Sequence, residues 1–251
     1  MSAPVFEARG LSVRLGTVDA LVDIELSIFA GETVALIGES GSGKTTLLRA
    51  FNRLVEPTRG ALFHHGKPLS GEEPIALRRR LGYVQQDGGL LPHWTVLENV
   101  GLVPRLLGWD AARMRSRAGE VLKLVGLEAR EYGSRYPRQL SGGQRQRVAV
   151  ARAMAADPDA ILLDEPFGAL DPITRESLQD EFRSWKGALG KTLLLVTHDL
   201  EEAFLLADRI AVLRAGRIEQ SGTAEELLKR PATSYVERLT ARHRRLREGK
   251  W

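Results

Sequence analysis

The sequence predicts an α/β fold with a mainly parallel sheet, and two observations carry this prediction. Short apolar runs, typical of buried strands, recur along the chain at residues 33–37, 160–163, 192–196 and 209–213. Segments with apolar residues at helical spacing lie between these runs, at residues 44–54 and after Pro172. Because strands that alternate with helices form parallel sheets covered by helices, we expect an α/β core.

Two segments predict local features beside this core. Residues 22–29 alternate between apolar and polar side chains, as in a strand with one buried face. Ala215 and Gly216 separate two short strand patterns, at residues 210–213 and 217–220, and are suited to the turn of a β-hairpin.

The pattern changes to helix in the middle of the chain. Residues 96–107 and 111–125 carry apolar side chains three and four positions apart. Asp110 is a good N-cap for the second of these helices, and Gly126 suits its C-terminal end. We therefore expect an inserted helical lobe at about residues 88–142.

Composition places the chain among ordinary globular proteins. It has 251 residues, of which 43% are hydrophobic, and no cysteine, which excludes disulfides and thiolate metal sites. The start has neither the basic nor the apolar region of a signal peptide, and no apolar run approaches the roughly 20 residues that span a bilayer. We expect a protein of a reducing cytoplasm that does not cross the membrane.

The net charge of +4 is located at the C-terminus. Residues 229–251 contain 8 of the 36 Lys and Arg but 2 of the 32 Asp and Glu, which leaves 28 against 30 elsewhere. We interpret the basic tail at residues 241–251 as a solvated helix face or frayed end, with contact to a membrane surface or nucleic acid as the alternative. No nucleic-acid partner is expected.

A phosphate-binding loop is predicted at residues 38–45, GESGSGKT, between a predicted strand and a predicted helix. Its glycines let backbone N–H groups surround a phosphate at a helix N-terminus. Lys44 would bridge the β- and γ-phosphates, and the Thr45 hydroxyl would bind magnesium. The alternative is a glycine-rich turn with a coincidental lysine and hydroxyl. The residues expected to bind nucleotide here are Gly38, Glu39, Ser40, Gly41, Ser42, Gly43, Lys44, Thr45 and Thr46.

Two carboxylates follow the apolar run at residues 160–163. Asp164 would lie at the tip of a buried strand, where it could hold magnesium directly or through water. Glu165 could polarise the water that attacks the γ-phosphate. Alone this pair is more often a solvated strand end, but after a phosphate loop it indicates a nucleoside triphosphatase.

Residues 140–144, LSGGQ, resemble the signature of the ATP-binding cassette (ABC) family. Ser141 offers a hydroxyl, and Gly142 and Gly143 offer backbone N–H groups at a helix start. The resemblance implies that these residues and Gln144 bind the γ-phosphate held by the opposite subunit, so that two ATP molecules lie in a head-to-tail homodimer. For Ser-Gly-Gly alone, a capped helix start is the alternative.

The remaining family motifs occur in the family's order. Gln86, with Gln85 as a near alternative, matches the glutamine that reaches magnesium and the attacking water. Asp171 ends a GALD sequence that resembles the loop crossing the dimer interface, and His198 matches the switch histidine that hydrogen-bonds the γ-phosphate. Leu15 falls where the family normally stacks an aromatic residue on adenine.

The resemblance covers residues 5–239 and implies a P-loop NTPase of the ABC type. It implies one nucleotide-binding domain at residues 1–240, with a RecA-like core, an antiparallel β subdomain and the helical lobe. ATP and Mg²⁺ are the implied cofactors. The implied partners are a second ATPase subunit, transmembrane permease subunits and an extracytoplasmic substrate-binding protein, with this chain peripheral on the cytoplasmic face of the cell membrane.

His64, His65 and Trp185 match no family role, and we expect them to be surface or packing residues.

Within the family, residues 81–109 closely resemble importers of osmoprotectants such as glycine betaine, choline and carnitine. Methionine-type and other amino-acid importers, and exporters, remain alternatives. Such osmoprotectant ATPases often carry regulatory CBS domains, which we expect this chain to lack because of its length.

A non-transport ABC protein is a further alternative. Such proteins act in DNA repair or on ribosomes and usually need coiled-coil inserts, zinc-binding cysteines or tandem cassettes, which we do not expect here. A cassette that binds ATP without cleaving it is disfavoured by the intact catalytic set of Lys44, Asp164, Glu165 and His198.

Overall fold

The computed structural model describes residues 3–247, which divide into two compact units. The first unit combines the chain up to Glu72 with the chain from Thr192 onward, and the second unit is Glu73–Lys191. The second unit contains the predicted helical lobe and also β-strands, so it is larger than the lobe expected at residues 88–142.

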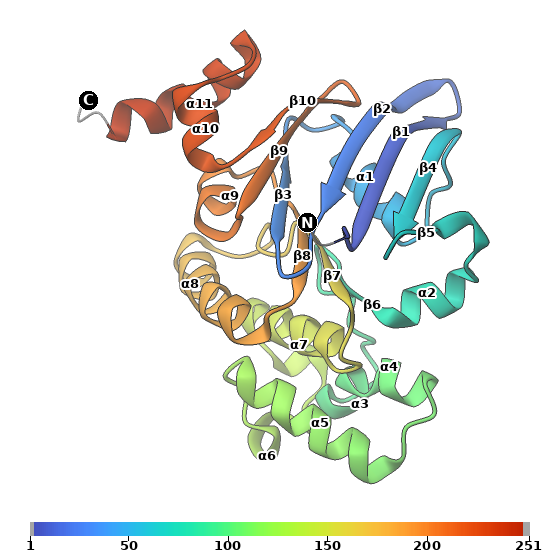
Figure 1. Cartoon of the computed structure of the whole chain (residues 1–251). Helices are drawn as coiled ribbons and strands as arrows, with labels where there is room; N and C mark the ends of the chain where they lie inside the picture. The colour runs from blue at the N-terminus through green and yellow to red at the C-terminus, as the bar shows by residue number, and fades with distance from the viewer. Residues whose placement is uncertain (1–2, 248–251) are drawn as a thin grey trace. The chain divides into compact units, whose positions relative to one another are not determined.

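An antiparallel sheet occupies the N-terminal part of the first unit (Figure 1). Its strand order is β2-β1-β4-β5, and the strands are β1 (Phe6–Leu15), β2 (Val18–Ile28), β4 (Arg59–His64) and β5 (Lys67–Pro68). Buried residues alternate along the second half of β2, including Ile24, Leu26 and Ile28, which confirms the half-buried strand predicted at residues 22–29. This sheet is the expected antiparallel β subdomain.

A second group of strands in the first unit surrounds β3 (Thr33–Ile37), which is buried along its whole length. β3 is parallel to both β8 (Thr192–Val196) and β9 (Arg209–Arg214), and β10 (Arg217–Gly222) pairs antiparallel with β9. The helices α1 (Lys44–Phe51) and α9 (Leu200–Leu206) contact β8 and β3 respectively. The continuous apolar runs in the sequence therefore are buried parallel strands.

The turn between β9 and β10 has the backbone of a tight hairpin. Ala215 and Gly216 both have positive φ, at 46° and 75°, as a type I′ turn requires. The predicted helix at residues 44–54 was three residues too long, because Arg53 has a left-handed φ of 54° and the helix ends at Phe51.

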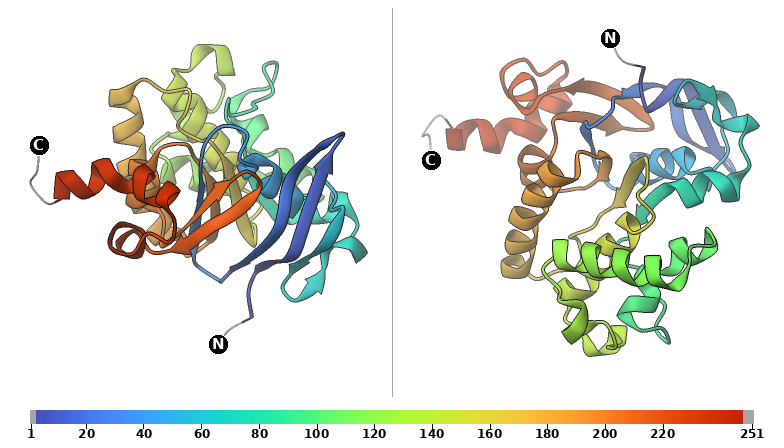
Figure 2. Two further views of the ribbon diagram at one scale, coloured as in Figure 1. Left: turned by 90° about the horizontal axis from the view of Figure 1, so that it is seen from above. Right: turned by 60° about the horizontal axis from the view of Figure 1, so that its bottom comes forward.

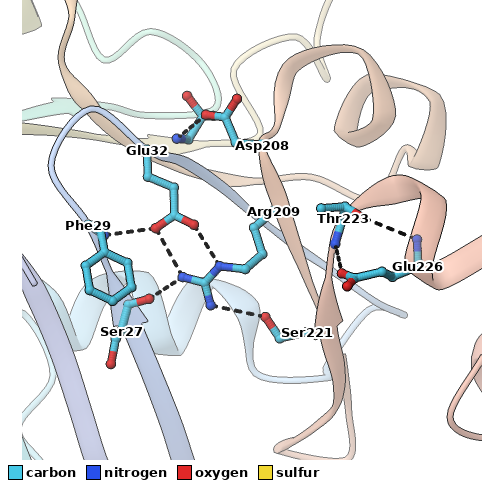
Figure 3. A network of polar contacts seen from close by, with 9 residues as sticks. Ser27, Phe29, Glu32, Asp208, Arg209, Ser221, Thr223 and Glu226 are labelled. Atoms are coloured by element: carbon cyan, nitrogen blue, oxygen red, sulfur yellow. Dashed lines mark hydrogen bonds and ion pairs between the residues drawn. The ribbon is translucent and has the colours of Figure 1, made fainter. Parts of the chain in front are cut away.

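A polar network ties the β2–β3 turn to the start of β9 (Figure 3). The Arg209 guanidinium donates to both carboxylate oxygens of Glu32, at 2.7 and 3.1 Å, and to the backbone carbonyl of Ser27. The carboxylate of Asp208 accepts from the Thr33 backbone N–H at 2.8 Å. Because Thr33 begins β3, these bonds fix where the strand that leads to the phosphate loop starts.

The first unit ends in two helices, α10 (Ala224–Lys229) and α11 (Ser234–Arg247). Figure 2 shows α11 extending away from the strands β1 and β2. Because α11 continues to Arg247, the basic tail predicted at residues 241–251 begins inside a helix; residues 248–251 lie outside the described residues.

The second unit is built around a parallel strand pair, β6 (Leu81–Val84) and β7 (Ala160–Asp164). Helix α7 (Gly142–Met154) packs against β6, and the lobe helices α3 and α5 pack against α7. The other helices of the unit are α2 (Pro74–Arg80), α3 (Val96–Val100), α4 (Leu102–Leu106), α5 (Ala111–Leu124), α6 (Ala129–Tyr132) and α8 (Pro172–Leu189). None of the described helices is long and apolar enough to span a bilayer.

The lobe confirms two predicted helix ends and corrects one helix. The Asp110 carboxylate accepts from the backbone N–H groups of Ala112 and Arg113, and Gly126 follows α5 with a φ of 71°. The single helix expected at residues 96–107 is two helices, because Gly101 ends α3 and caps α4.

The residues without a family role are surface or packing residues, as expected. His64 is buried and stacks on Phe6 with ring centroids 4.9 Å apart, and Trp185 is buried with its ring edge against Phe182. His65 is exposed.

Candidate nucleotide-binding site

The predicted site residues fall into two groups, one in each compact unit. The phosphate loop, Leu15 and His198 belong to the first unit. Gln86, the carboxylates after β7, the signature sequence and Asp171 belong to the second unit.

The phosphate loop leaves the end of β3 in a conformation that needs glycine. Gly38 has a φ of 149°, and a Cβ atom there would lie 2.1 Å from the Leu213 carbonyl oxygen. At Gly43, with a φ of 104°, a Cβ atom would lie 2.6 Å from the Ala20 carbonyl oxygen. Neither position can hold a side chain without moving the neighbouring backbone. The packing around both glycines therefore gives this loop a fixed backbone.

Lys44 lies across this loop. It is buried, and its Nζ donates to the backbone carbonyls of Gly38 and Glu39 at 2.8 and 2.9 Å. Lys44 is also the first residue of α1, so the unpaired N–H groups of the first helical turn face the same loop. The loop thus gathers an ammonium group and a helix N-terminus, both of which favour an anion.

The rest of the loop divides into an exposed rim and a packed base. The rim residues Glu39, Ser40 and Gly41 are exposed, whereas Ser42 is buried and Thr45 and Thr46 are half-buried. The Ser42 carbonyl accepts from the Gly216 backbone N–H at 3.1 Å, which fastens the base of the loop to the β9–β10 hairpin.

His198 comes to the same end of the strands as the phosphate loop. Val196 of β8 is in register with Leu36 of β3, and the Thr197 backbone N–H donates to the Leu36 carbonyl at 3.1 Å. The chain leaving β8 therefore runs beside the chain leaving β3. His198 is exposed, and the next residue, Asp199, caps α9.

Leu15 lies at the tip of the antiparallel sheet. It ends β1, pairs with Val18 across the hairpin and is 49% exposed. An apolar side chain with this exposure has a free face that could cover a flat ring.

In the second unit, the structure brings the predicted carboxylates and glutamine together. Asp164 ends β7, is buried, and accepts from the Tyr83 hydroxyl at 3.4 Å. The Gln86 side-chain N–H lies 3.5 Å from the Glu165 carboxylate. Glu165 has a left-handed φ of 47°, an uncommon conformation for a residue other than glycine.

The two candidate glutamines have different surroundings. A Cβ atom on Gly89 would lie 2.4 Å from the Gln85 side-chain oxygen, which places Gln85 against the turn that follows it. Gln86 instead reaches Glu165. The geometry favours Gln86 over Gln85 as the glutamine of this site.

The signature sequence is a capped helix start. The Ser141 hydroxyl accepts from the Gln144 backbone N–H at 3.2 Å, and the Gln144 side chain accepts from the Ser141 backbone N–H at 2.9 Å. This is a capping box, so a capped helix start, the alternative interpretation of Ser-Gly-Gly, describes the local structure correctly. The Ser141 hydroxyl hydrogen is not used by this box and can still be donated.

The glycines of the signature also pack against the segment around α8. A Cβ atom on Gly143 would lie 2.7 Å from the Thr174 side chain, and one on Gly142 would lie 3.3 Å from Leu170. Asp171 caps α8 by accepting from the Thr174 backbone N–H at 3.1 Å. Hydrogen bonds from the Thr174 side chain and backbone hold the pKa of Asp171 below its ordinary value, so the cap is anionic at neutral pH.

Two residues near the carboxylates and the glutamine were not predicted from the sequence to belong to this site. Tyr83 contacts Asp164, and Arg152 of α7 donates to the backbone carbonyls of Gly88 and Gly89 just after the glutamine. Strand alternation could have suggested that Tyr83 faces one side of β6. Nothing local in the sequence links Arg152 to a loop more than sixty residues away.

A glycine-formed phosphate loop in one unit, and a strand-end carboxylate pair with a glutamine in the other, define the class of P-loop nucleotide-binding proteins. The family model described as ABC transporter matches residues 21–168. The chain therefore belongs to the ABC transporter family, as the signature sequence predicted.

Relatives of known role share the sequence over most of this chain. The glycine betaine/carnitine/choline transport ATP-binding protein OpuCA of Bacillus subtilis (strain 168) is 50% identical over 232 residues, which are 92% of this chain and 61% of OpuCA. The glycine betaine uptake system ATP-binding protein YehX of Escherichia coli (strain K12) is 44% identical over 238 residues, 95% of this chain and 77% of YehX. The chain spans only about three fifths of the length of the OpuCA-type relatives.

Solved structures confirm the ABC cassette fold. The dimeric post-hydrolysis state of the ATP-binding cassette MJ0796, bound to ADP and Pi, has a TM-score of 0.76 at 35% identity and covers 87% of this chain and 98% of its own. The cbiO1 protein from Clostridium perfringens, part of the ABC transporter complex cbiONQ, has a TM-score of 0.84 at 27% identity and covers 98% of this chain and 100% of its own.

Proposed function

We propose that this chain is the ATP-hydrolysing subunit of an ABC importer that takes up a quaternary-ammonium osmoprotectant. The observation that carries the proposal of hydrolysis is the approach of the Gln86 amide to the Glu165 carboxylate at 3.5 Å, directly after the buried Asp164. An amide and a carboxylate side by side can hold one water molecule by donating to it and accepting from it.

The nucleotide would be bound by the phosphate loop. Lys44 now donates to two loop carbonyls, and its ammonium group would turn to the β- and γ-phosphates when they enter. Leu15 would cover adenine, and His198 would donate to the γ-phosphate. In a head-to-tail homodimer, the Ser141 hydroxyl, the N-terminus of α7 and the loop ending at Asp171 would complete the site of the opposite subunit. The dimeric MJ0796 structure, bound to ADP and Pi, supports a dimer that binds nucleotide.

Mg²⁺ fits the chemistry of the proposed ligands. Thr45 offers a hydroxyl, Asp164 a carboxylate and Gln86 an amide oxygen, and Mg²⁺ prefers oxygen ligands. When bound with ATP, the ion would neutralise charge that develops on the phosphates. Glu165 would orient the attacking water and accept its proton.

The proposed partners are transmembrane permease subunits and an extracytoplasmic substrate-binding protein, which would hold this chain at the cytoplasmic face of the cell membrane. The names of OpuCA and YehX support a transport complex for quaternary amines. The permease would bind the lobe at a groove lined by Trp94, Leu97 and Met114. The Arg105 guanidinium lies 5.8 Å from the Trp94 ring, so this groove combines aromatic, apolar and cationic groups typical of interface centres.

The test of hydrolysis is Glu165→Gln. We expect this variant to bind ATP normally and to lose hydrolysis by about 100-fold or more, because the amide cannot accept the proton. The trapped ATP should hold the dimer together in gel filtration. Lys44→Ala is the matched control, which should lose ATP binding itself. Wild-type turnover in Glu165→Gln would refute the role of Glu165.

The test of substrate class is uptake in proteoliposomes that contain this subunit with its permease and binding protein. Labelled glycine betaine or choline should accumulate inside the vesicles only when ATP is present. A binding protein that ignores quaternary amines and binds an amino acid would overturn the substrate class and leave the ATPase proposal standing.

A further inference from the structure

The turn after Gln86 contains two successive glycines. Gly88 and Gly89 both have positive φ, at 73° and 57°, and the Gly88 N–H donates to the Gln85 carbonyl at 2.9 Å. Glycine adopts positive φ as readily as negative φ, so the backbone of this turn is permissive and its own sequence does not fix its position. The position of Gln86, the residue just before this turn, therefore depends on what holds the turn.

Arg152 holds it. One terminal nitrogen of its guanidinium donates to the Gly89 carbonyl and the other to the Gly88 carbonyl, each at 2.7 Å. Arg152 lies on α7, about three helical turns after Ser141 caps that helix. The helix is fixed in turn by its packing against β6 and the lobe helices α3 and α5. The glutamine turn and the signature sequence are thus attached to the same helix.

These contacts hold a half-buried cation. Burial lowers the pKa of Arg152 below its ordinary value, and within residues 3–247 the guanidinium has no ion pair with a carboxylate. A partly desolvated charge without a carboxylate partner is less favourable than the same charge in water, so its place here depends on the two carbonyl contacts. Lysine would be a poorer replacement, because it donates from a single nitrogen, whereas the guanidinium reaches the two carbonyls from two nitrogens held in one plane.

We propose that Arg152 is a positioning residue for hydrolysis, which acts by holding the glutamine turn so that Gln86 stays beside Glu165. Through α7 it also connects that turn to the signature sequence, so that a movement of the signature helix moves Gln86. The inference rests on the proposed ATPase function. A purely structural Arg152 would stabilise the lobe and would affect hydrolysis only through loss of folded protein.

The test compares Arg152→Lys with a matched control, Arg117→Lys. The Arg117 guanidinium on α5 also donates to two successive carbonyls, of Met154 and Ala155, at the far end of α7 from the signature sequence. We expect Arg152→Lys to lower kcat about 10- to 100-fold, with the Kd for ATP unchanged, because a small displacement of an aligning group slows the chemical step. Arg117→Lys should keep kcat within about twofold, as expected of a contact outside the reacting groups.

A double variant separates positioning from a structural role. If Arg152 acts through Gln86, then Arg152→Lys combined with Gln86→Ala should be no slower than Gln86→Ala alone. Losses that multiply would overturn the inference, as would wild-type kcat in Arg152→Lys while Gln86→Ala is slow. Arg152→Gln, which keeps a single donor nitrogen, replaces the lysine variant if that variant does not fold.

Hydrogen–deuterium exchange gives a readout that does not need activity. The amides of residues 85–90 should exchange faster in Arg152→Lys than in the wild type and unchanged in Arg117→Lys. Equal exchange in all three proteins would overturn the inference. If the wild-type protein bound ATP but did not hydrolyse it, the proposed function would fail, and the exchange result would still decide whether Arg152 holds the turn.

Discussion

The phosphate loop and the glutamine turn are both glycine-containing segments that follow parallel strands, but they are held in different ways. The phosphate loop is held by close backbone packing at Gly38 and by its own lysine, Lys44. The turn at residues 87–89 is held by Arg152, which lies 63 residues after Gly89 in the sequence. The phosphate loop is therefore held by neighbouring backbone and by a lysine of its own motif, whereas the glutamine turn depends on a side chain of a distant helix.

This difference decides how each loop responds to change. A loop fixed by backbone packing is disrupted by a side chain added at a packed glycine such as Gly38. A loop fixed by one distant side chain keeps its backbone freedom and can follow the helix that carries that side chain. Under the proposed function, the first arrangement would keep the loop in shape for phosphate, and the second would let the glutamine turn follow a movement of α7.

The largest expected effect is at Gly38. In Gly38→Ala the new Cβ atom would meet the Leu213 carbonyl at 2.1 Å at a φ of 149°, so the loop and β9 must separate. We expect a loss of about 3 kcal/mol or more in the free energy of unfolding, from strain and overpacking together. Binding of ATP should no longer be measurable by calorimetry.

Gly41→Ala is the matched control for that change. Gly41 also has a positive φ, of 77°, but a Cβ atom there would meet nothing within 4 Å. Only the left-handed backbone opposes the substitution, so urea unfolding should give a loss of about 1 to 2 kcal/mol. Equal losses at both glycines would show that backbone packing does not hold this loop.

The next largest effect is expected at Asn99, which contacts the chain that follows the glutamine turn. Asn99 is fully buried, and its amide donates to the carbonyls of Leu91, Trp94 and Thr95 and accepts from the Leu91 N–H. It holds the chain after the glutamine turn as Arg152 holds the turn itself. Asn99→Ala should lower the free energy of unfolding by about 2 to 4 kcal/mol, because several buried backbone groups lose their partner.

Asn99→Asp tests which part of that amide matters. The carboxylate keeps an acceptor for the Leu91 N–H but has no hydrogen to give to the three carbonyls. Urea unfolding should place this variant near Asn99→Ala. A loss below about 1 kcal/mol in both variants would mean that packing, and not the Asn99 amide, holds residues 91–95.

The smallest effect is at Leu15, which tests the adenine end of the proposed nucleotide site. A base stacked on an aromatic ring gains about 1 to 3 kcal/mol relative to alanine, and leucine recovers part of this by burial. Leu15→Tyr should therefore tighten ATP binding by up to about 1 kcal/mol, or roughly fivefold. Unchanged affinity in calorimetry would mean that another residue covers the base.

Most elements were predictable because their causes are local. The apolar run at residues 33–37, the capping side chain of Asp110 and the two positive-φ residues of the Ala215-Gly216 turn each act within a few positions of the chain. The end of α1 was less predictable. It depends on the left-handed backbone of Arg53, and an arginine side chain does not favour that conformation.

The α/β class, the ABC family and most of the proposed site residues could be predicted from the sequence, because motifs such as residues 38–45 and 140–144 are contiguous and their residue types are specific. Two facts could be found only in the tertiary structure: Gln86 rather than Gln85 lies beside Glu165, and Arg152 holds the turn after Gln86. Both facts depend on which side chains meet across segments far apart in the chain. Spacing along one segment carries no information about such contacts, since they arise only when strands and helices pack.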